Sequence, residues 1–294
     1  MSNKILIKNA TIVNEGTSVI MDVLIEGSII SRIDKEINIT SSINIINADG
    51  LTLIPGMIDD QVHFREPGLT HKGNIFTESR AAVAGGVTSF IEMPNTIPNT
   101  TNDKALYQKI DIAKSKSFAN FSFMFGGTNN NIDDILNVDE SNIAGIKLFL
   151  GSSTGNMLVD NHKAIEKIFR STKLPISVHC EDEEIIKRNL IKHINKYGDD
   201  IPMDLHPVIR NQEACYKSSK FAIELAKKTG ARLNVFHIST AKELELFDNN
   251  VPISQKKITS EACAHHLWFT DKDYKLLGSK IKWNPAIKTE YDKN

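Results

Sequence analysis

Short apolar runs separated by turn-forming residues fill the first part of the chain. These runs lie at positions 5–7, 23–25, 29–30 and 43–46, and Asn, Gly, Ser and Asp separate them. Short apolar runs bounded by such residues are typical of β-strands. We therefore expect residues 1–54 to form a small N-terminal β unit, a piece of a β-sandwich.

After Pro55 and Gly56 the pattern changes, because β-rich apolar runs now alternate with amphipathic stretches of helical length. The expected strands are 57–62, 87–93, 120–125, 144–150, 175–179, 232–237 and 257–261. The expected helices include 75–84, 101–114, 162–171 and 213–229. This alternation predicts a parallel sheet with right-handed crossovers. Seven repetitions favour a closed barrel over an open doubly wound sheet, so the predicted fold is α/β, a TIM-type (β/α)8 barrel over residues 55–294.

The number of strands is one short for such a barrel, which closes with eight. The segment 181–220 uses extra length as an insertion, and residues 284–294 are typical of a loop and helix start after strand seven. We therefore expect the barrel to be incomplete at its C-terminal end, without its eighth strand. Seven parallel strands leave two unpaired edges. Either the natural protein continues past Asn294, or this copy is a partial chain.

Charge and hydropathy narrow the class of partner. The chain has 35 basic and 36 acidic residues, so a nucleic acid or an anionic membrane is not expected as a partner. No stretch approaches the roughly 18 consecutive apolar residues of a membrane span, and residues 1–8 lack a signal-peptide pattern. We expect a cytoplasmic protein with a small-molecule substrate, as a homodimer, the commonest oligomer. Cys180, Cys215 and Cys263 form no C-x-x-C pair and are expected to be free thiols.

Four polar side chains stand at the ends of predicted strands. His63, Lys147, His179 and His237 end or lie on the first, fourth, fifth and sixth strands. Active groups of (β/α) barrels gather at the carboxyl ends of strands. A single such histidine is more often structural, but three that converge on one barrel mouth favour a site for zinc or a similar divalent ion.

Lys147 is unusual because a lysine on an apolar strand buries a charge. One interpretation gives it a carboxylate partner or an exposed end at the rim. In the other, burial lowers its pKa, and the neutral amine takes up carbon dioxide to become an anionic carbamate that bridges two metals. The strand-end histidines favour the second interpretation.

Several segments in a fixed order resemble the dihydroorotase branch of the amidohydrolase superfamily. They are IPGMIDDQVHFREPG (54–68), GGVTSFIEMPNT (85–96), GIKLFLGSSTGNMLVD (145–160), ISVHCEDE (176–183), NVFHIST (234–240), ITSEACAHHLWFTD (258–271) and KWNPAIKTE (282–290). The resemblance implies a metal-dependent cyclic amide hydrolase that interconverts N-carbamoyl-L-aspartate and L-dihydroorotate in pyrimidine biosynthesis.

The resemblance also assigns roles to residues. It implies that His63 binds one metal, that Lys147 is the carboxylated bridging lysine, and that His179 and His237 bind the second metal. The cofactors would be one or two zinc ions and the carbon dioxide of the carbamate. The resemblance further implies that Arg65 and Asn95 bind the substrate carboxylate and that Asn284 lines the substrate pocket.

Arg65 bears on the choice among relatives. A guanidinium can form a bidentate pair with a carboxylate near the metal; alternatively, Arg65 pairs with Glu66 or Glu78 at the rim. Similar allantoinases usually carry Asn at this position, and similar hydantoinases lack the Arg-Glu-Pro-Gly continuation. We therefore prefer dihydroorotate as substrate. A hydrolase of allantoin or a hydantoin, and a non-catalytic dihydroorotase-like subunit that is a scaffold for a partner such as aspartate transcarbamoylase, stay open as alternatives.

Two departures from the family pattern lead to further expectations. Gln61 occupies the first position of the usual His-x-His, and a carboxamide oxygen is a weak zinc ligand. The aspartate that normally ends strand eight does not occur in these 294 residues. We therefore expect one tightly held ion at Lys147, His179 and His237, a second that is weak or absent, and a chain that is nearly inactive by itself.

The remaining histidines and glycines have less specific interpretations. An adjacent pair cannot both point inward, so we expect a rim or packing role for His265 and His266. His71, His162, His193 and His206 are expected to be solvated or structural. The glycines at 126–127 and 151–155 lack a P-loop ending and are expected to form strand-end turns.

Overall fold

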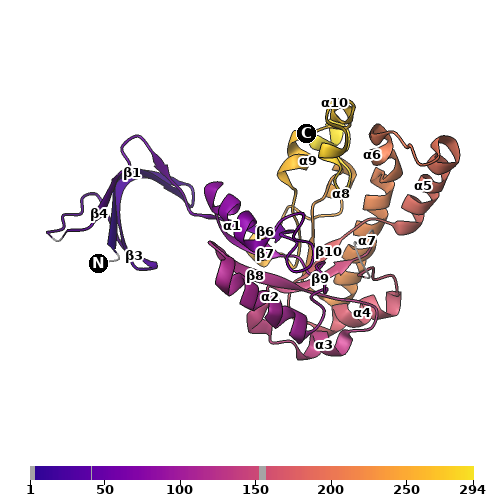
Figure 1. The fold of residues 1–294 in the computed structure, drawn as a ribbon, viewed down its shortest axis with the longest axis horizontal. Coiled ribbons are helices and arrows are strands. Elements are labelled where there is room, and N and C mark those ends of the chain that lie inside the picture. The colour runs from indigo at the N-terminus through magenta and orange to yellow at the C-terminus, as the bar shows by residue number, and fades with distance from the viewer. Residues whose placement is uncertain (1–3, 41, 152–156) are drawn as a thin grey trace. The chain divides into compact units, whose positions relative to one another are not determined.

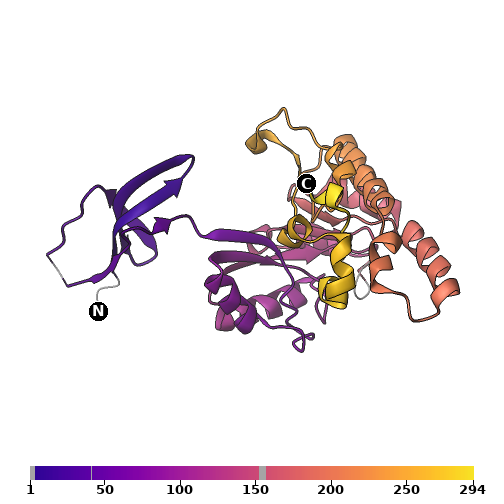
Figure 2. The ribbon, with the colours of Figure 1, turned by 90° about the horizontal axis from the view of Figure 1, so that it is seen from above.

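The chain divides into two compact units. The computed structural model describes residues 4–40, 42–151 and 157–294, and the units are Met1–Met57 and Ile58–Asn294. The division falls beside the boundary that we expected between residues 54 and 55. Each unit contains its own sheet, and Figures 1 and 2 show both from two directions.

The first unit is a five-stranded mixed sheet. Its strands are β1 (Lys4–Asn14), β2 (Thr17–Glu26), β3 (Ile29–Asp34), β4 (Asn44–Asn47) and β5 (Thr52–Leu53). β2 pairs with β1 and β3 in antiparallel fashion, whereas β4 and β5 run parallel to β1. The described part of this unit is a single sheet, in agreement with the small β unit, a piece of a β-sandwich, that we expected.

Asp22 holds the irregular part of this sheet together. The pairing of β1 with β2 shifts between Ile7 and Ala10, and Asn9 in this bulge has a φ of 59°. The buried Asp22 carboxylate accepts hydrogen bonds of 2.9 Å from the backbone N–H groups of Asn9 and Ile37. Burial alone would raise the pKa of Asp22, but these two hydrogen bonds and the nearby Lys8 lower it.

The second unit contains a curled seven-stranded sheet. Its strands are β6 (Met57–Val62), β7 (Val87–Glu92), β8 (Asn120–Gly126), β9 (Gly145–Phe149), β10 (Ile176–His179), β11 (Leu233–Val235) and β12 (Ile258–Ser260). They lie side by side in chain order, and the pairs from β7 to β12 are parallel. The expected α/β barrel architecture is therefore confirmed as a partial barrel, with no eighth strand among the described residues.

Helices follow the strands, as the alternation predicted. The α-helices are α1 (Ile75–Ala84), α2 (Asp103–Lys116), α3 (Ile132–Asn137), α4 (His162–Ser171), α5 (Glu183–Tyr197), α6 (His206–Ile209), α7 (Gln212–Thr229), α8 (Ala241–Leu244), α9 (Ala264–Trp268), α10 (Tyr274–Leu277) and α11 (Glu290–Lys293). The 3-10 turns are η1 (Glu140–Asn142), η2 (Met203–Leu205), η3 (Ile253–Gln255), η4 (Asp271–Asp273) and η5 (Gly278–Ile281). In the described part of the chain, no helix has both the length and the apolar character of a membrane span.

Side-chain caps explain where the longer helices begin. Asn74, Asn102, Asn161, Asp182 and Asn211 each accept a hydrogen bond from a backbone N–H in the first turn of α1, α2, α4, α5 and α7. Such caps satisfy donors that the helix itself leaves unpaired. In Figure 1, helices α2, α3 and α4 cover one side of the curled sheet. Buried side chains such as Phe90, Phe125 and Leu148 form the apolar core between sheet and helices.

An ion pair is buried between β7 and α2. Glu92 and Lys109 are almost completely inaccessible to solvent and form a salt bridge, and Lys109 Nζ also donates a hydrogen bond of 2.7 Å to the Met93 carbonyl oxygen. Burial raises the pKa of Glu92, and the charge of Lys109 opposes that shift. Each charge therefore depends on the other for compensation.

The Asp22 contacts generate a stability prediction. Asn at position 22 offers only one acceptor oxygen, so Asp22→Asn leaves a buried N–H unpaired and lowers the free energy of unfolding of the first unit by about 1–3 kcal/mol. Because the folded-state pKa is lowered, the stabilisation by Asp22 is complete above its ordinary pKa of 3.8 and is lost as the pH falls through the folded-state value. Chemical denaturation from pH 7 to pH 3 measures both effects. Asp49→Asn, at an exposed site, is the control; an equal effect of the two variants would contradict this account.

The buried ion pair generates a second prediction. Lys109→Met leaves Glu92 without its partner and lowers the free energy of unfolding by about 3–5 kcal/mol. Glu92→Gln combined with Lys109→Met removes the orphaned charge, so the double variant is more stable than Lys109→Met alone. Lys104→Met, at an exposed position of the same helix, is the control. Strictly additive effects in this double-mutant cycle would show that the two charges are not coupled.

Candidate functional site

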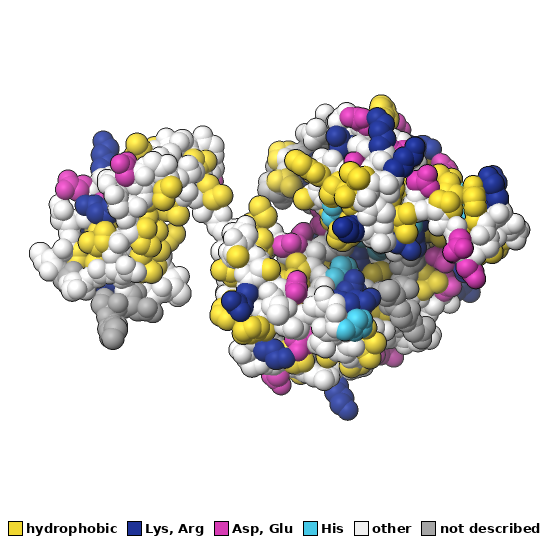
Figure 3. All heavy atoms as spheres, turned by 45° about the horizontal axis from the view of Figure 1, so that its top comes forward, with side chains coloured by type: hydrophobic (Ala, Val, Ile, Leu, Met, Phe, Trp, Pro, Cys, Tyr) yellow, Lys and Arg dark blue, Asp and Glu magenta, His cyan; other side chains and the backbone are white. Residues whose placement is uncertain are grey.

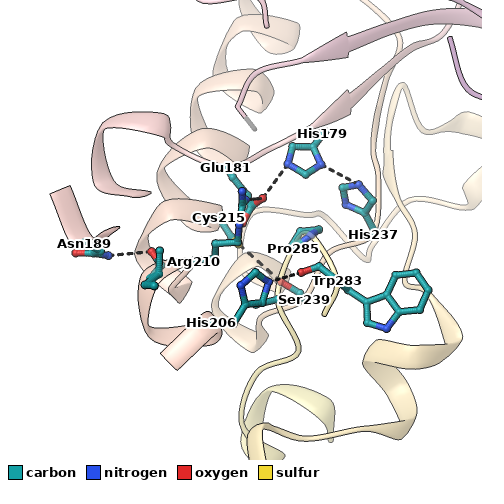
Figure 4. Close-up of polar contacts among 12 residues, drawn as sticks. His179, Glu181, Asn189, His206, Arg210, Cys215, His237, Ser239, Trp283 and Pro285 are labelled. Carbon is teal, nitrogen blue, oxygen red and sulfur yellow. Dashed lines mark hydrogen bonds and ion pairs between the residues drawn. The ribbon is translucent and has the colours of Figure 1, made fainter. Parts of the chain in front are cut away.

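Two histidines from neighbouring strands meet at the end of the sheet. His179 ends β10 and His237 follows β11; both are buried, and His179 Nδ1 lies 3.1 Å from His237 Nε2 (Figure 4). Two nitrogens that bind one tetrahedral zinc ion are separated by about 3.3 Å, given Zn–N bonds of about 2.0–2.1 Å. The pair therefore has nearly the spacing of two ligands of one ion.

Glu181 and Arg210 fix the orientation of His179. The Nε2–H of His179 donates to Glu181 Oε2 at 2.9 Å, and the Arg210 guanidinium forms an ion pair with the same oxygen (Figure 4). Burial by itself would raise the pKa of Glu181, but the hydrogen bond from His179 and the charge of Arg210 lower it to about 2. A proton on Nε2 leaves Nδ1 with a lone pair, as a metal ligand requires. The sequence reasoning assigned no role to Glu181 or Arg210, although Glu181 lies within the motif around His179.

Lys147 presents a buried amine without a hydrogen-bond partner. Its Nζ, on β9, is inaccessible and unpaired among the described residues, and it lies 4.0 Å from the centroid of the Phe236 ring. Burial lowers the pKa of Lys147 to about 7, against the opposing charge of Glu261. The expected alternative, a carboxylate partner or an exposed end, does not describe this side chain.

Lys147 and the three histidines share one electrostatic environment. Burial is the main cause of a lowered pKa in His63, His179 and His237, and the charge of Lys147 contributes to the lowering in all three. The structure thus brings the four strand-end residues together. In Figure 3, histidine side chains are visible inside a hollow of the larger unit, with acidic side chains at its edge.

Arg65 and Asn95 flank His63. Asn95 follows β7, which ends at Glu92. The uncharged amide of its side chain forms a hydrogen bond with His63. Arg65 has a φ of 70°, in the left-handed region that non-glycine residues rarely adopt, and its backbone N–H donates to Glu92 Oε1 at 3.2 Å. Strained backbone of this kind is concentrated at functional sites, and His237 has a φ of 42° as well.

The guanidinium of Arg65 is available for a ligand. Its Nη1 is buried without a hydrogen-bond partner in the described part of the chain. Glu66, one of the two partners considered for it, pairs instead with Lys116 and accepts a 2.9 Å hydrogen bond from the Ile75 N–H. Glu78 accepts a hydrogen bond from Thr77.

Asn284 lies close to Arg210. It is exposed and lines a pocket of about 290 Å³ together with His206 and Arg210. Arg210, which lines the same pocket, forms an ion pair with Glu181, and Glu181 in turn contacts His179. His206, which we expected to be solvated or structural, donates a hydrogen bond of 2.7 Å from Nε2–H to the Trp283 carbonyl oxygen.

Glycines at the strand ends allow close packing. A Cβ on Gly151, directly after β9, would lie 1.7 Å from the Glu181 carbonyl oxygen, and one on Gly126 would lie 2.4 Å from Met157 Cε. A side chain is therefore excluded at Gly151, where the obstacle is backbone, whereas at Gly126 the end of the Met157 side chain would have to move. Residues 152–156, which complete the expected turn and part of the motif at 145–160, lie outside the described residues.

Side chains from the first and last strands of the sheet also meet. Cys263 Sγ lies 3.7 Å from Gln61 Oε1, and Glu261 hydrogen-bonds Asp60 and accepts a 2.8 Å hydrogen bond from Asn234. Burial, together with the neighbouring Asp60, raises the pKa of Glu261 to about 8. The sequence reasoning missed these contacts, because nothing in the local pattern shows that positions 60–61 and 261–263 are adjacent.

Comparisons with known proteins agree with the motifs. No family model matches the chain. It is 31% identical to a dihydroorotase of Methanosarcina mazei over 96% of this chain and 62% of the relative, and 32% identical to one of Methanosphaera stadtmanae over 98% and 65%. An allantoinase of Salmonella choleraesuis is 30% identical over 99% of this chain and 65% of the relative. The chain thus spans less than two thirds of the length of these relatives.

Known structures support the fold. An L-hydantoinase of Arthrobacter aurescens superimposes with a TM-score of 0.92 at 24% identity, over 100% of this chain and 65% of that one. A dihydropyrimidinase of Brevibacillus agri superimposes with a TM-score of 0.85 at 23% identity, over 99% and 64%. The family resemblance is therefore confirmed: along nearly its whole length the chain is similar to dihydroorotases and allantoinases, and it has the fold of the hydantoinases.

Proposed function

We propose that the natural protein containing these residues is a metal-dependent dihydroorotase, which interconverts N-carbamoyl-L-aspartate and L-dihydroorotate. The observation that carries the proposal is the paired nitrogens of His179 and His237 beside the unpartnered amine of Lys147. The similarity to named dihydroorotases supports it. A cytoplasmic location and a homodimeric state belong to the same proposal.

The donor set fits a zinc ion. His179 Nδ1 and His237 Nε2 would hold it, with Lys147 as a carbamate completing the site and His63 directed to a second ion. A bound metal supplies a water whose pKa is about 7 and a Lewis acid for the amide oxygen. The chain's own contribution is a neutral, desolvated amine at Lys147 that can add to carbon dioxide, forming an N–C bond and releasing a proton.

Arg65 and Asn95 would orient the substrate. A guanidinium with a free N–H and a neighbouring amide can bind the ring carboxylate of dihydroorotate through charge-assisted hydrogen bonds. Glu92 accepts a hydrogen bond from the backbone N–H of Arg65, and Lys109 forms an ion pair with Glu92. A substrate without a carboxylate gains little from this arrangement.

A hydrolase of allantoin is the second candidate, because an allantoinase is 30% identical over nearly the whole chain. Allantoin carries no carboxylate, so Arg65 distinguishes the two activities. The effect of Arg65 on activity likewise distinguishes a hydantoin substrate from dihydroorotate.

Substrate assays on the natural protein, loaded with zinc in the presence of bicarbonate, test the proposal. We expect ring opening of dihydroorotate, and its loss in Lys147→Ala. Arg65→Asn lowers kcat/KM for dihydroorotate by about 100-fold, because charge-assisted hydrogen bonds contribute about 1.5–3 kcal/mol each. Turnover of allantoin, if measurable, changes much less.

Arg188→Asn, at an exposed position on α5, is the matched control and keeps wild-type kinetics. Failure of the metal-loaded wild-type protein to open dihydroorotate would refute the proposal. Faster turnover of allantoin than of dihydroorotate would favour the second candidate.

A further inference from the structure

A second group of metal-binding side chains lies directly after β12, outside the set that the motifs imply. Cys263, His265 and His266 each offer one ligand atom, and these atoms all lie within 4.8 Å of one another. The two imidazole centroids are 4.3 Å apart. Although the histidines are adjacent in sequence, both bring a ring nitrogen near the same thiol, contrary to our expectation that only one of them could face a common point.

His266 is oriented as a metal ligand usually is. Its Nε2–H donates to the Pro285 carbonyl oxygen at 3.0 Å, which leaves Nδ1 as the nitrogen with a lone pair. That Nδ1 is buried and has no hydrogen-bond partner among the described residues, and the side chain is 7% exposed. Metal-binding histidines commonly donate their other N–H to a carbonyl group in this manner. The unpaired nitrogen is therefore an observation independent of the clustering.

The surroundings of the thiol also favour a cation. Cys263 Sγ lies 3.7 Å from Gln61 Oε1, close to the separation of about 3.5 Å expected for a sulfur and an oxygen on one tetrahedral zinc ion. Asp59, Asp60 and Glu261 lie close enough to act electrostatically on the thiol. The negative potential of the two aspartates disfavours an isolated thiolate but attracts a divalent ion, which in turn stabilises the thiolate.

His265 is held by an aromatic neighbour. Its ring stacks on Trp283, with centroids 4.0 Å apart and an interplanar angle of 12°. This contact restricts the plane of the His265 ring. The Trp283 carbonyl oxygen accepts from His206, so the segment that carries both the Trp283 ring and Pro285 is itself fixed.

We propose that Cys263, His265 and His266 form a site for a soft divalent cation such as Zn²⁺, with a fourth coordination position beside Gln61. Ligand atoms around a tetrahedral zinc ion are about 3.4 Å apart. Ligand atoms up to 4.8 Å apart therefore need to approach one another by up to about 1.4 Å on binding. The site lies where the family's first His-x-His histidine is replaced by Gln61. All three ligands belong to the segment that follows β12. The proposal does not depend on the proposed hydrolase activity.

Cobalt binding under reducing conditions tests the site. Co²⁺ added to the metal-free protein gives a near-ultraviolet thiolate-to-cobalt charge-transfer band, which only a cysteine ligand produces. We expect the band to reach its maximum when one Co²⁺ ion per chain is bound at this site. The band disappears in Cys263→Ser. His266→Gln lowers the affinity for Co²⁺, measured from the intensity of this band, by at least about 10-fold.

Two controls separate this site from other groups. Cys180→Ser keeps the band, since Cys180 already contacts the hydroxyls of Ser218 and Ser219. His179→Ala also keeps it, because His179 belongs to the other group. A band that survives Cys263→Ser, or cobalt binding without any band, overturns the proposal.

A measurement on the wild-type protein applies even if the Cys263→Ser variant does not fold. Zn²⁺ protects Cys263 from alkylation by iodoacetamide, which peptide mass spectrometry quantifies. We expect at least about a 10-fold slower modification with zinc present, by analogy with the affinity change above. An unchanged rate at saturating zinc overturns the proposal.

Discussion

Buried nitrogen atoms without a hydrogen-bond partner in the described part of the chain lie at the centre of the candidate site. Lys147 Nζ, His63 Nδ1 and His237 Nδ1 are inaccessible and unpaired among the described residues. An unsatisfied buried polar group costs about 1–3 kcal/mol, and several in one place are not expected in a fold unless a ligand satisfies them. An anionic modification of Lys147 and a second cation at His63 would supply two of these missing interactions.

Other parts of the second unit keep this group in position. Glu181 and Arg210 select the ring nitrogen that His179 presents. Glu92 and Lys109 form a buried ion pair, and Glu92 also accepts a hydrogen bond from the strained backbone at Arg65. The partial barrel brings β6, β9, β10 and β11 close enough for their end residues to interact, although these strands are far apart in sequence.

Helices and strands, which depend on the local pattern of apolar and polar residues, were predicted well from the sequence. The expected helices 75–84 and 162–171 have the predicted bounds, and all seven barrel strands occur within a few residues of their predicted positions. These elements combine clear periodicity with Asn caps such as Asn74 and Asn161. The convergence of His63, Lys147, His179 and His237 followed from the general rule about strand ends.

What the sequence did not reveal depends on contacts between distant segments. The ion pair of Glu181 with Arg210 and the contact of Cys263 with Gln61 join residues whose positions follow only from the completed fold. Asn284 was placed with the substrate residues by resemblance, and the pocket that it lines with Arg210 could not be seen in the sequence.

Diffraction from crystals grown with zinc and bicarbonate, recorded at the zinc absorption edge, tests the central claim most directly. The account predicts an anomalous peak about 2.0–2.2 Å from both His179 Nδ1 and His237 Nε2, with additional density on Lys147 Nζ. Zinc-loaded crystals with no peak between these two nitrogens, and with a bare Lys147 paired to a carboxylate, would contradict it.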